Sequence, residues 1–329
     1  MDAAHCWVSH PQEWQPLFRR WHDAHPGRTR LHVFPQFGGS AVVGLTVGGA
    51  RRPVDALPPF RLLVTVPHAH EPAPTAAAVD VACQLVAGTH LDGSPSALPT
   101  EAILACSLIT LLPDTNSQGR ARSSPPCWDG TFCDNETFLR TAFGIAADGQ
   151  RFGRYPQWRP SEHHPRQIGL VYECLEDDLY VEPNTSRLST HSRVIDALFG
   201  EYRYTHMLDM HQHEFSEQAQ LPADFEDLPV ADREGLLHWA AVLVLAWRRA
   251  GAQPRPDAAM PYPGQPRQGL LAAFWRDRCP GMLRMLSEDR NNRLEPAGIA
   301  PTPLPYQFAT ALAALEATLS LAEGAGPHG

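Results

Sequence analysis

The segment Arg61-Leu-Leu-Val-Thr-Val-Pro-His68-Ala-His70-Glu71-Pro72 is an apolar run that ends abruptly in two histidines and a carboxylate. The run has the length and composition of a buried strand, and Pro72 suits the first turn of a following helix. Imidazole and carboxylate groups are the ligands that zinc takes in hydrolytic sites, and a strand that carries them at its end holds them rigidly. The segment therefore predicts a metal site at the carboxyl end of a core strand.

Helical and strand-like patterns alternate along the rest of the chain. Apolar residues recur at helical spacing over 12–24, 75–87, 189–199, 236–250 and 307–322. Strand-like runs cover 30–34, 40–47, 61–66, 103–112, 204–210 and 282–286. Strands separated by helices predict an α/β fold, a mixed and largely parallel twisted sheet with helices on both faces.

Length and loop content bear on the domain organisation. The 329 residues, 43% of them hydrophobic, are enough to bury a substantial core, and we expect a single catalytic domain over 1–329. Residues 1–50 form its N-terminal helix and hairpin lead-in. Residues 113–185 predict a long loop region over the site, because irregular segments of such length are usually functional.

Charge and cysteine content exclude several classes of function. The formal charge is −9, and the 27 cationic residues are all arginine and scattered, so we expect neither nucleic acid nor membrane as a partner. The 7 cysteines show no CxxC spacing, and the N-terminus lacks the pattern of a secretory signal. We therefore expect a cytoplasmic protein with reduced thiols.

Residues with catalytic chemistry follow the predicted core strands. His68 and Glu71 follow one strand, His211 follows another, and together they would bind one zinc ion per chain, with the fourth position left for water. Glu288 follows the last strand and is the predicted general base for that water. Arg120 or Arg122 would stabilise the oxyanion that forms on the attacked carbonyl.

Other residues compete for these roles. His213 lies on the same side of its strand as His211, which we prefer because it follows the apolar run directly. His70 is expected to point away from its neighbours by the alternation of a strand. Glu295 is the alternative to Glu288 as the base.

In this order, the motifs resemble the zinc carboxypeptidase superfamily, the carboxypeptidase A-like metallopeptidases, over nearly the whole chain. Pro67-His68-Ala-His70-Glu71 resembles the family's HxxE ligand pair, and Asn116-Ser-Gln-Gly119-Arg120-Ala-Arg122 resembles the turn that introduces the oxyanion arginine. Leu208-Asp-Met-His211 and Leu286-Ser-Glu288 resemble the strands of the third ligand and the catalytic glutamate. The resemblance implies an atypical bacterial member, a protease that cleaves a peptide bond with zinc.

The sequence departs from the family where the substrate carboxylate binds. Family members have an Asn-Arg pair there, whereas Asp134-Asn135-Glu136 has a glutamate in place of the arginine. Asn135 with Arg140 would then bind the substrate. Three further arginines in the predicted loop region are alternative sources of the clamp, namely Arg154, Arg159 and Arg166.

Two other functions stay open. The family's amidohydrolase branch shares the metal motif, so the substrate is either a peptide or an acyl-amino acid. The third hypothesis is an inactive family member that serves as a binding protein, which would lack zinc or zinc-dependent hydrolysis.

Overall fold

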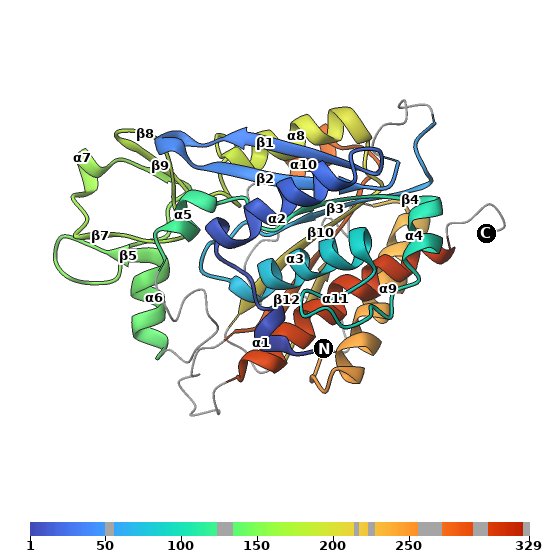
Figure 1. The fold of residues 1–329 in the computed structure, drawn as a ribbon. Helices are drawn as coiled ribbons and strands as arrows, with labels where there is room; N and C mark the ends of the chain where they lie inside the picture. Colours follow the sequence, from blue (N-terminus) through green and yellow to red (C-terminus); the bar gives the residue numbers. More distant parts are fainter. Residues whose placement is uncertain are drawn as a thin grey trace.

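A seven-stranded sheet forms the centre of the molecule, with strand order β1-β2-β4-β3-β10-β12-β11 (Figure 1). This computed structural model describes residues 1–49, 56–123, 134–213, 217–222, 228–255, 272–291 and 302–324. The strands of the sheet are β1 (Thr29–Pro35), β2 (Ala41–Val47), β3 (Phe60–Thr65), β4 (Ser107–Leu112), β10 (His206–His213), β11 (Ala219–Pro222) and β12 (Leu283–Arg290).

The inner strands β4, β3, β10 and β12 pair in parallel, whereas β1, β2 and β11 are antiparallel additions at the two edges. β3 and β4 are almost entirely buried, as expected for apolar runs that are covered on both faces. This arrangement confirms the predicted mixed, largely parallel α/β fold. It also brings the carboxyl ends of the inner strands to one edge, where α/β sheets assemble their sites.

Helices cover both faces of the sheet (Figure 1). α3, α9 and α11 pack together on one face, and α2 adds Trp14 and Phe18 to the same core. On the other face, Leu198 of α8 and Trp275 of α10 share a core with Leu63 of β3. The helices of these two layers are α1 (Ala3–Cys6), α2 (Pro11–Ala24), α3 (Pro72–Ala87), α4 (Thr100–Cys106), α8 (Thr190–Tyr202), α9 (Val230–Arg249), α10 (Ala272–Arg278) and α11 (Leu304–Gly324).

The helix that follows the ligand motif, α3, is buried from Pro72 to Val86. Its alanines have small side chains, which allow α11 and the sheet to pack closely around it. Gly88 ends α3 in the left-handed conformation, with φ of 74°, and its N–H bonds to the carbonyl of Gln84. The ligand loop is therefore joined to one of the most deeply buried elements of the molecule.

The predicted elements are present, but several of their ends differ. The predicted strand over 103–112 is wrong in its first part, because α4 extends to Cys106 and β4 begins only at Ser107. The Ser107 hydroxyl donates to the carbonyl of Ile103 at 2.6 Å and so closes the end of α4. β10 and β12 run further than predicted because they remain paired up to His213 and Arg290, so His211 and Glu288 lie within strands.

The segment predicted as loops, 113–185, contains short helices and two small sheets in its described part (Figure 1, green). Phe152, Trp158, Val171 and Tyr172 form a small core there. The elements are α5 (Ser117–Ala121), α6 (Asn135–Phe143), β5 (Gly144–Ile145), β6 (Gln157–Trp158), α7 (Pro160–His163), β7 (Gln167–Ile168), β8 (Glu173–Glu176) and β9 (Leu179–Val181). A further 3-10 turn, η1, covers Phe37–Gly39 between β1 and β2.

Two predictions from composition concern cysteines and membrane spans. The cysteines that the structure describes, Cys6, Cys83, Cys106, Cys174 and Cys279, are free thiols, whereas Cys127 and Cys133 lie outside the described residues. Within the described ranges, no helix has both the length and the apolar character that crossing a bilayer requires.

Candidate metal centre

His68 and Glu71 lie in the tight loop between β3 and α3. The Glu71 N–H bonds to the His68 carbonyl at 3.1 Å, and α3 begins at the next residue. Arg120, fully buried in α5, donates from one guanidinium nitrogen to the carbonyls of His68 and Glu71 and to the Thr75 hydroxyl, at 3.0 to 3.2 Å. These contacts hold the backbone of the loop in place, and with it the positions of the His68 and Glu71 side chains.

Three buried side chains converge at the carboxyl ends of β3 and β10. His68 Nδ1 lies 2.9 Å from Glu71 Oε1 and 3.1 Å from His211 Nδ1, and His211 Nδ1 lies 3.2 Å from Glu71 Oε2. Ligand atoms of His68, Glu71 and His211 all lie within 4.8 Å of one another. Two ring nitrogens that face each other next to a carboxylate form a set of donors suited to one cation.

The outer nitrogen of each ring is bound to a second carboxylate. His68 Nε2 lies 2.9 Å from Oε1 of Glu182, and His211 Nε2 lies 3.1 Å from Oδ2 of Asp209. The Thr65 hydroxyl donates to the other oxygen of Asp209 at 2.6 Å and fixes that carboxylate. A proton on each Nε2 would leave Nδ1 with its lone pair directed into the group, which is the tautomer that a metal ligand needs.

The electrostatics of the group are dominated by its carboxylates. Burial alone would lower the pKa of His68, but Glu71 and Glu182 raise that pKa above its usual value. Burial acts in the same way on His211, whose pKa is raised well above its usual value by Asp209 and Glu71. The pKa of Glu71 is well below its usual value despite burial, because both imidazoles lie against it. The group therefore has the negative character that attracts a cation.

Arg154 extends over the group from the segment between α6 and β6. Its Nη2 lies 3.3 Å from Glu182 Oε1 and 3.4 Å from His68 Nε2, and its side chain is 49% exposed. Burial would raise the pKa of Glu182, but Arg154 and His68 hold that pKa below its usual value. About half of the Arg154 side chain is accessible beside the buried imidazoles, so Arg154 is placed to bind an anionic group from solution.

Glu288 lies next to His211 across the parallel pair β10 and β12. The two residues are direct register partners, and side chains of paired residues in a sheet point to the same face. Asp209 and His213 share that face, because they lie two residues on either side of His211. The register thus places the Glu288 side chain next to that of His211.

Two of the arginines predicted to act in the site have other partners. Arg122 donates to the carbonyls of Gly169 and Tyr172, at 3.3 and 2.7 Å. Arg140 donates to Glu136 at 2.6 Å and to the Gly149 carbonyl at 2.9 Å. Asn135 is the first residue of α6. The structure does not bring the guanidinium groups of Arg122 and Arg140 to the three converging ligands.

The competing histidines are close to the ligands. His70 stacks on His68, with ring centres 5.2 Å apart, and its Nε2 lies 3.5 Å from Glu71 Oε1. The alternation of a strand does not apply to His70, because the chain has already left β3 and forms a turn there. His213 is buried on the same face as His211, two residues further along β10. Glu295, the alternative base, lies outside the described residues.

Sequence reasoning missed the two outer carboxylates. Asp209 could have been found, because alternation along a strand places it on the same face as His211. Glu182 follows β9 in the sequence Val181-Glu182-Pro183 and has no motif around it. Its position depends on the folding of the segment from α6 to β9 over the sheet, which no local pattern reveals.

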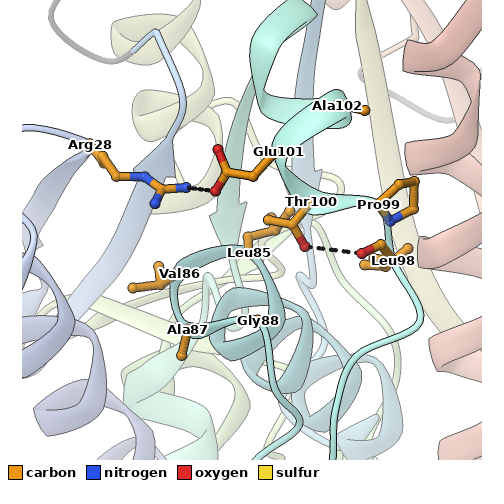
Figure 2. Close-up of a pocket in the computed structure, with 10 residues that line it drawn as sticks. All are labelled: Arg28, Leu85, Val86, Ala87, Gly88, Leu98, Pro99, Thr100, Glu101 and Ala102. Atoms are coloured by element: carbon orange, nitrogen blue, oxygen red, sulfur yellow. Dashed lines mark hydrogen bonds and ion pairs between the residues drawn. The ribbon is translucent and has the colours of Figure 1, made fainter.

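The cavity in Figure 2 lies at the C-terminal end of α3, whereas His68 and Glu71 lie before its N-terminal end. It has a volume of about 520 Å³ and lies between the C-terminal end of α3 and the start of α4. The Arg28 and Glu101 side chains form an ion pair there at 3.0 Å (Figure 2). Because both side chains are well exposed, that pair contributes little to stability. The cavity shares no residue with the metal centre.

No protein-family model and no curated protein matches the chain. Among solved structures, carboxypeptidase A from Helicoverpa armigera is 12% identical, with a TM-score of 0.56, over 99% of this chain and 76% of that one. A metallo-carboxypeptidase from Pseudomonas aeruginosa is 13% identical, with a TM-score of 0.53, over 92% and 67%. Bovine thrombin-activatable fibrinolysis inhibitor, in complex with tick carboxypeptidase inhibitor, is 11% identical, with a TM-score of 0.53, over 99% of both chains.

These likenesses extend over nearly the whole chain at very low identity, so they concern the arrangement of helices and strands. The sheet order and the helices on its two faces agree with them. The chain has the fold of the metallo-carboxypeptidases.

Proposed function

We propose that the protein is a zinc-dependent hydrolase that cleaves an amide bond, with His68, Glu71 and His211 as the metal ligands. The observation that carries the proposal is the convergence of their donor atoms, at 2.9 to 3.2 Å from one another. Zinc–ligand distances of about 2.0–2.2 Å in a tetrahedron separate neighbouring ligand atoms by roughly 3.3–3.6 Å, slightly more than the spacing seen here. The donor set and its spacing therefore fit one zinc ion.

The residues around the ligands suit this role as well. Glu182 and Asp209 would each accept a hydrogen bond from the outer nitrogen of a ligand histidine and fix its orientation. Arg120 would keep the His68–Glu71 loop in place through its carbonyl contacts. A bound zinc ion would supply Lewis acidity, which polarises a scissile carbonyl and makes water a better nucleophile at neutral pH.

Glu288 is the proposed general base. Its register position beside His211 supports this role, because a carboxylate there could take a proton from the attacking water and return it to the leaving amine. Arg154 is the proposed oxyanion donor in place of Arg120 or Arg122, because its side chain is half exposed and its guanidinium lies at the outer edge of the His68 ring. A preformed positive charge at that point would stabilise the negative charge that develops on the attacked carbonyl.

The substrate is either a peptide with a free C-terminus or an acyl-amino acid. Arg140, the arginine expected to bind the carboxylate of a peptide, is bound to Glu136 and to the Gly149 carbonyl. This pairing favours an acyl-amino acid as the substrate. A carboxypeptidase would lose activity when the C-terminal carboxylate is an amide. A deacylase that reads the acyl group would tolerate the amide.

The test is hydrolysis by the zinc-loaded wild type and by Glu288→Gln. We expect the variant to retain zinc and to lose activity by about 10²- to 10⁴-fold, the usual contribution of a general base. Glu13→Gln, on the exposed surface of α2, is the matched control and should behave as wild type.

Each substrate is offered as the free acid and as the C-terminal amide. A Glu288→Gln variant with wild-type turnover would remove Glu288 from the mechanism. Stoichiometric zinc without hydrolysis of either substrate class would favour a binding protein over an enzyme.

A further inference from the structure

α9 exposes a stripe of side chains along one side. Val230, Glu234, Leu237, Ala241, Leu245 and Arg248 all lie on the surface. At about 100° per residue, these positions fall on the same side of a helix. Leu237 and Leu245 are 48% and 51% exposed and give the stripe an apolar centre, and Val230, which is 68% exposed, lies at its N-terminal end.

The stripe is symmetric about Ala241. Leu237 and Leu245 lie four residues on either side of it, and Glu234 and Arg248 lie seven residues on either side. Within the described part of the chain, no ion pair involves Glu234 or Arg248. Along the face, the order is acid, leucine, alanine, leucine and base. Two copies of this face that pack antiparallel therefore bring each acid opposite a base and each leucine opposite a leucine.

We propose that this face binds a second copy of the chain, with the two α9 helices antiparallel and crossing at Ala241. In that arrangement, Leu237 packs on Leu245 of the partner subunit, and Glu234 pairs with Arg248 of the partner subunit. Each contact occurs twice, as the two-fold symmetry of an isologous interface requires.

The crossing point and the charges both suit this pairing. Ala241 has a small side chain, which permits helix axes to approach to about 8 Å, the close end of the usual range. The antiparallel order also places the N-terminal end of each helix next to the C-terminal end of the other, so the helix dipoles attract. A parallel pair would instead bring Glu234 against Glu234 and Arg248 against Arg248.

A groove beside Leu245 provides room for the partner. It has a volume of about 510 Å³ and lies between α9 and α11, with Val242, Ala246 and Ala317 among its lining residues. Leu237 of the partner subunit reaches Leu245 at the edge of this groove and fills part of it. The interface lies on the α9 and α11 layer, whereas the metal ligands lie on the opposite face of β10 from the residues that pack against α9.

The test uses charge reversal and sedimentation velocity over a range of protein concentrations. The wild type should form a dimer. Glu234→Arg alone and Arg248→Glu alone should each weaken dimerisation by at least tenfold, because each change places like charges opposite one another twice. An equal mixture of the two variants should restore the dimer, because the reversed charges then face each other.

Leu245→Asp should also give a monomer, whereas Leu188→Asp is the matched control because Leu188 is equally exposed at 51% but lies outside α9. Circular dichroism of every variant verifies folding, and the recovery in the mixture shows that both reversed chains are folded. A wild type that is monomeric at all concentrations overturns the proposal. A dimer that is unaffected by either charge reversal assigns the interface elsewhere and also overturns it.

Discussion

Two buried clusters in this molecule combine histidine with carboxylates, and they are built in opposite ways. In the Asp80 cluster (Asp80, Gln84, His90 and Glu316), His90 Nδ1 lies 2.7 Å from Asp80 Oδ2, and Gln84 and the Leu91 N–H also donate to Asp80. One carboxylate there is surrounded by donors. In the metal centre, two ring nitrogens face each other and the carboxylates bind their outer sides.

The difference shows what distinguishes a candidate ligand from a structural histidine. Both clusters contain the same residue types at similar burial, so composition does not separate them. In the Asp80 cluster, the donors satisfy the carboxylate and hold the chain after Gly88 against α3. In the candidate metal centre, the Nδ1 atoms of His68 and His211 and the carboxylate of Glu71 converge instead. Among the described residues, His68, Glu71 and His211 are the group whose donor atoms come together in this way.

The largest expected contrast is in zinc affinity. His211→Ala should reduce it by more than the 10- to 100-fold loss that is typical when a residue only orients a ligand. His90→Ala should leave it unchanged. Isothermal titration with zinc, or elemental analysis after dialysis, measures both. Equal zinc loss in the two variants would mean that the clusters do not differ in the proposed way.

The carboxylates behind the ligands should have the next largest effect. Glu182→Gln removes the charge beside His68 Nε2 while it keeps the shape of the side chain, so zinc affinity should fall by about 10- to 100-fold. Glu316→Gln is the matched control in the Asp80 cluster, because Glu316 also accepts a hydrogen bond from a neighbouring side chain. Zinc affinity that is unaffected by Glu182→Gln would exclude this residue as the one that orients His68.

The Asp80 cluster should respond in stability and not in zinc binding. Asp80→Asn weakens the contacts from His90, Gln84 and the Leu91 N–H, so the free energy of unfolding should fall by about 1–3 kcal/mol. Urea denaturation measures the change, and zinc titration of the same sample should match wild type. A loss of zinc affinity of tenfold or more would contradict the assignment of this cluster as structural.

A third buried carboxyl group, that of Asp289, should make the stability of the protein depend on pH. Burial, aided by the neighbouring Glu288, raises the pKa of Asp289 to about 8, so this side chain is neutral in the folded protein at pH 6. Because the folded pKa exceeds the usual 3.8, its favourable contribution is complete below about pH 3.8 and is lost as pH rises towards 8. The loss is about 1.4 kcal/mol per pH unit.

Asp289→Asn should remove this slope, so the variant should gain stability relative to wild type from pH 5 to pH 8. Urea denaturation at several pH values measures the difference. Asp148→Asn, in an exposed turn, should run parallel to wild type throughout. A constant difference between Asp289→Asn and wild type across this range would show that Asp289 is already ionised.

Much of the fold could be predicted from the sequence, because apolar periodicity and turn residues are local signals. The helices and the inner strands follow those signals, and so does the order of the motifs that carry His68, Glu71, His211 and Glu288. The first part of 103–112 could not be assigned, because Ile103 to Cys106 is apolar enough for either a strand or a buried helix. The predicted strands 204–210 and 282–286 are also too short, because the end of a strand depends on how far its neighbour pairs with it.

The supporting residues of the site depend on tertiary structure. Arg120 and Arg122 are two residues apart, and only the fold decides that one guanidinium lies under the ligand loop and the other on the carbonyls of Gly169 and Tyr172. The approach of Arg154 and Glu182 to His68 results from packing of the segment between α6 and β9. No spacing in the sequence encodes it.

The parallel pairing of β3 with β10 also has a consequence for how the protein reaches its native state. His68 and His211 are brought together only when strands far apart in the sequence have paired, and contacts of such long sequence separation form slowly. The proposed zinc site is therefore complete only after β3 and β10 have paired. Zinc bound there as proposed would stabilise the native state by mass action, and the gain in stability would grow with the logarithm of the zinc concentration.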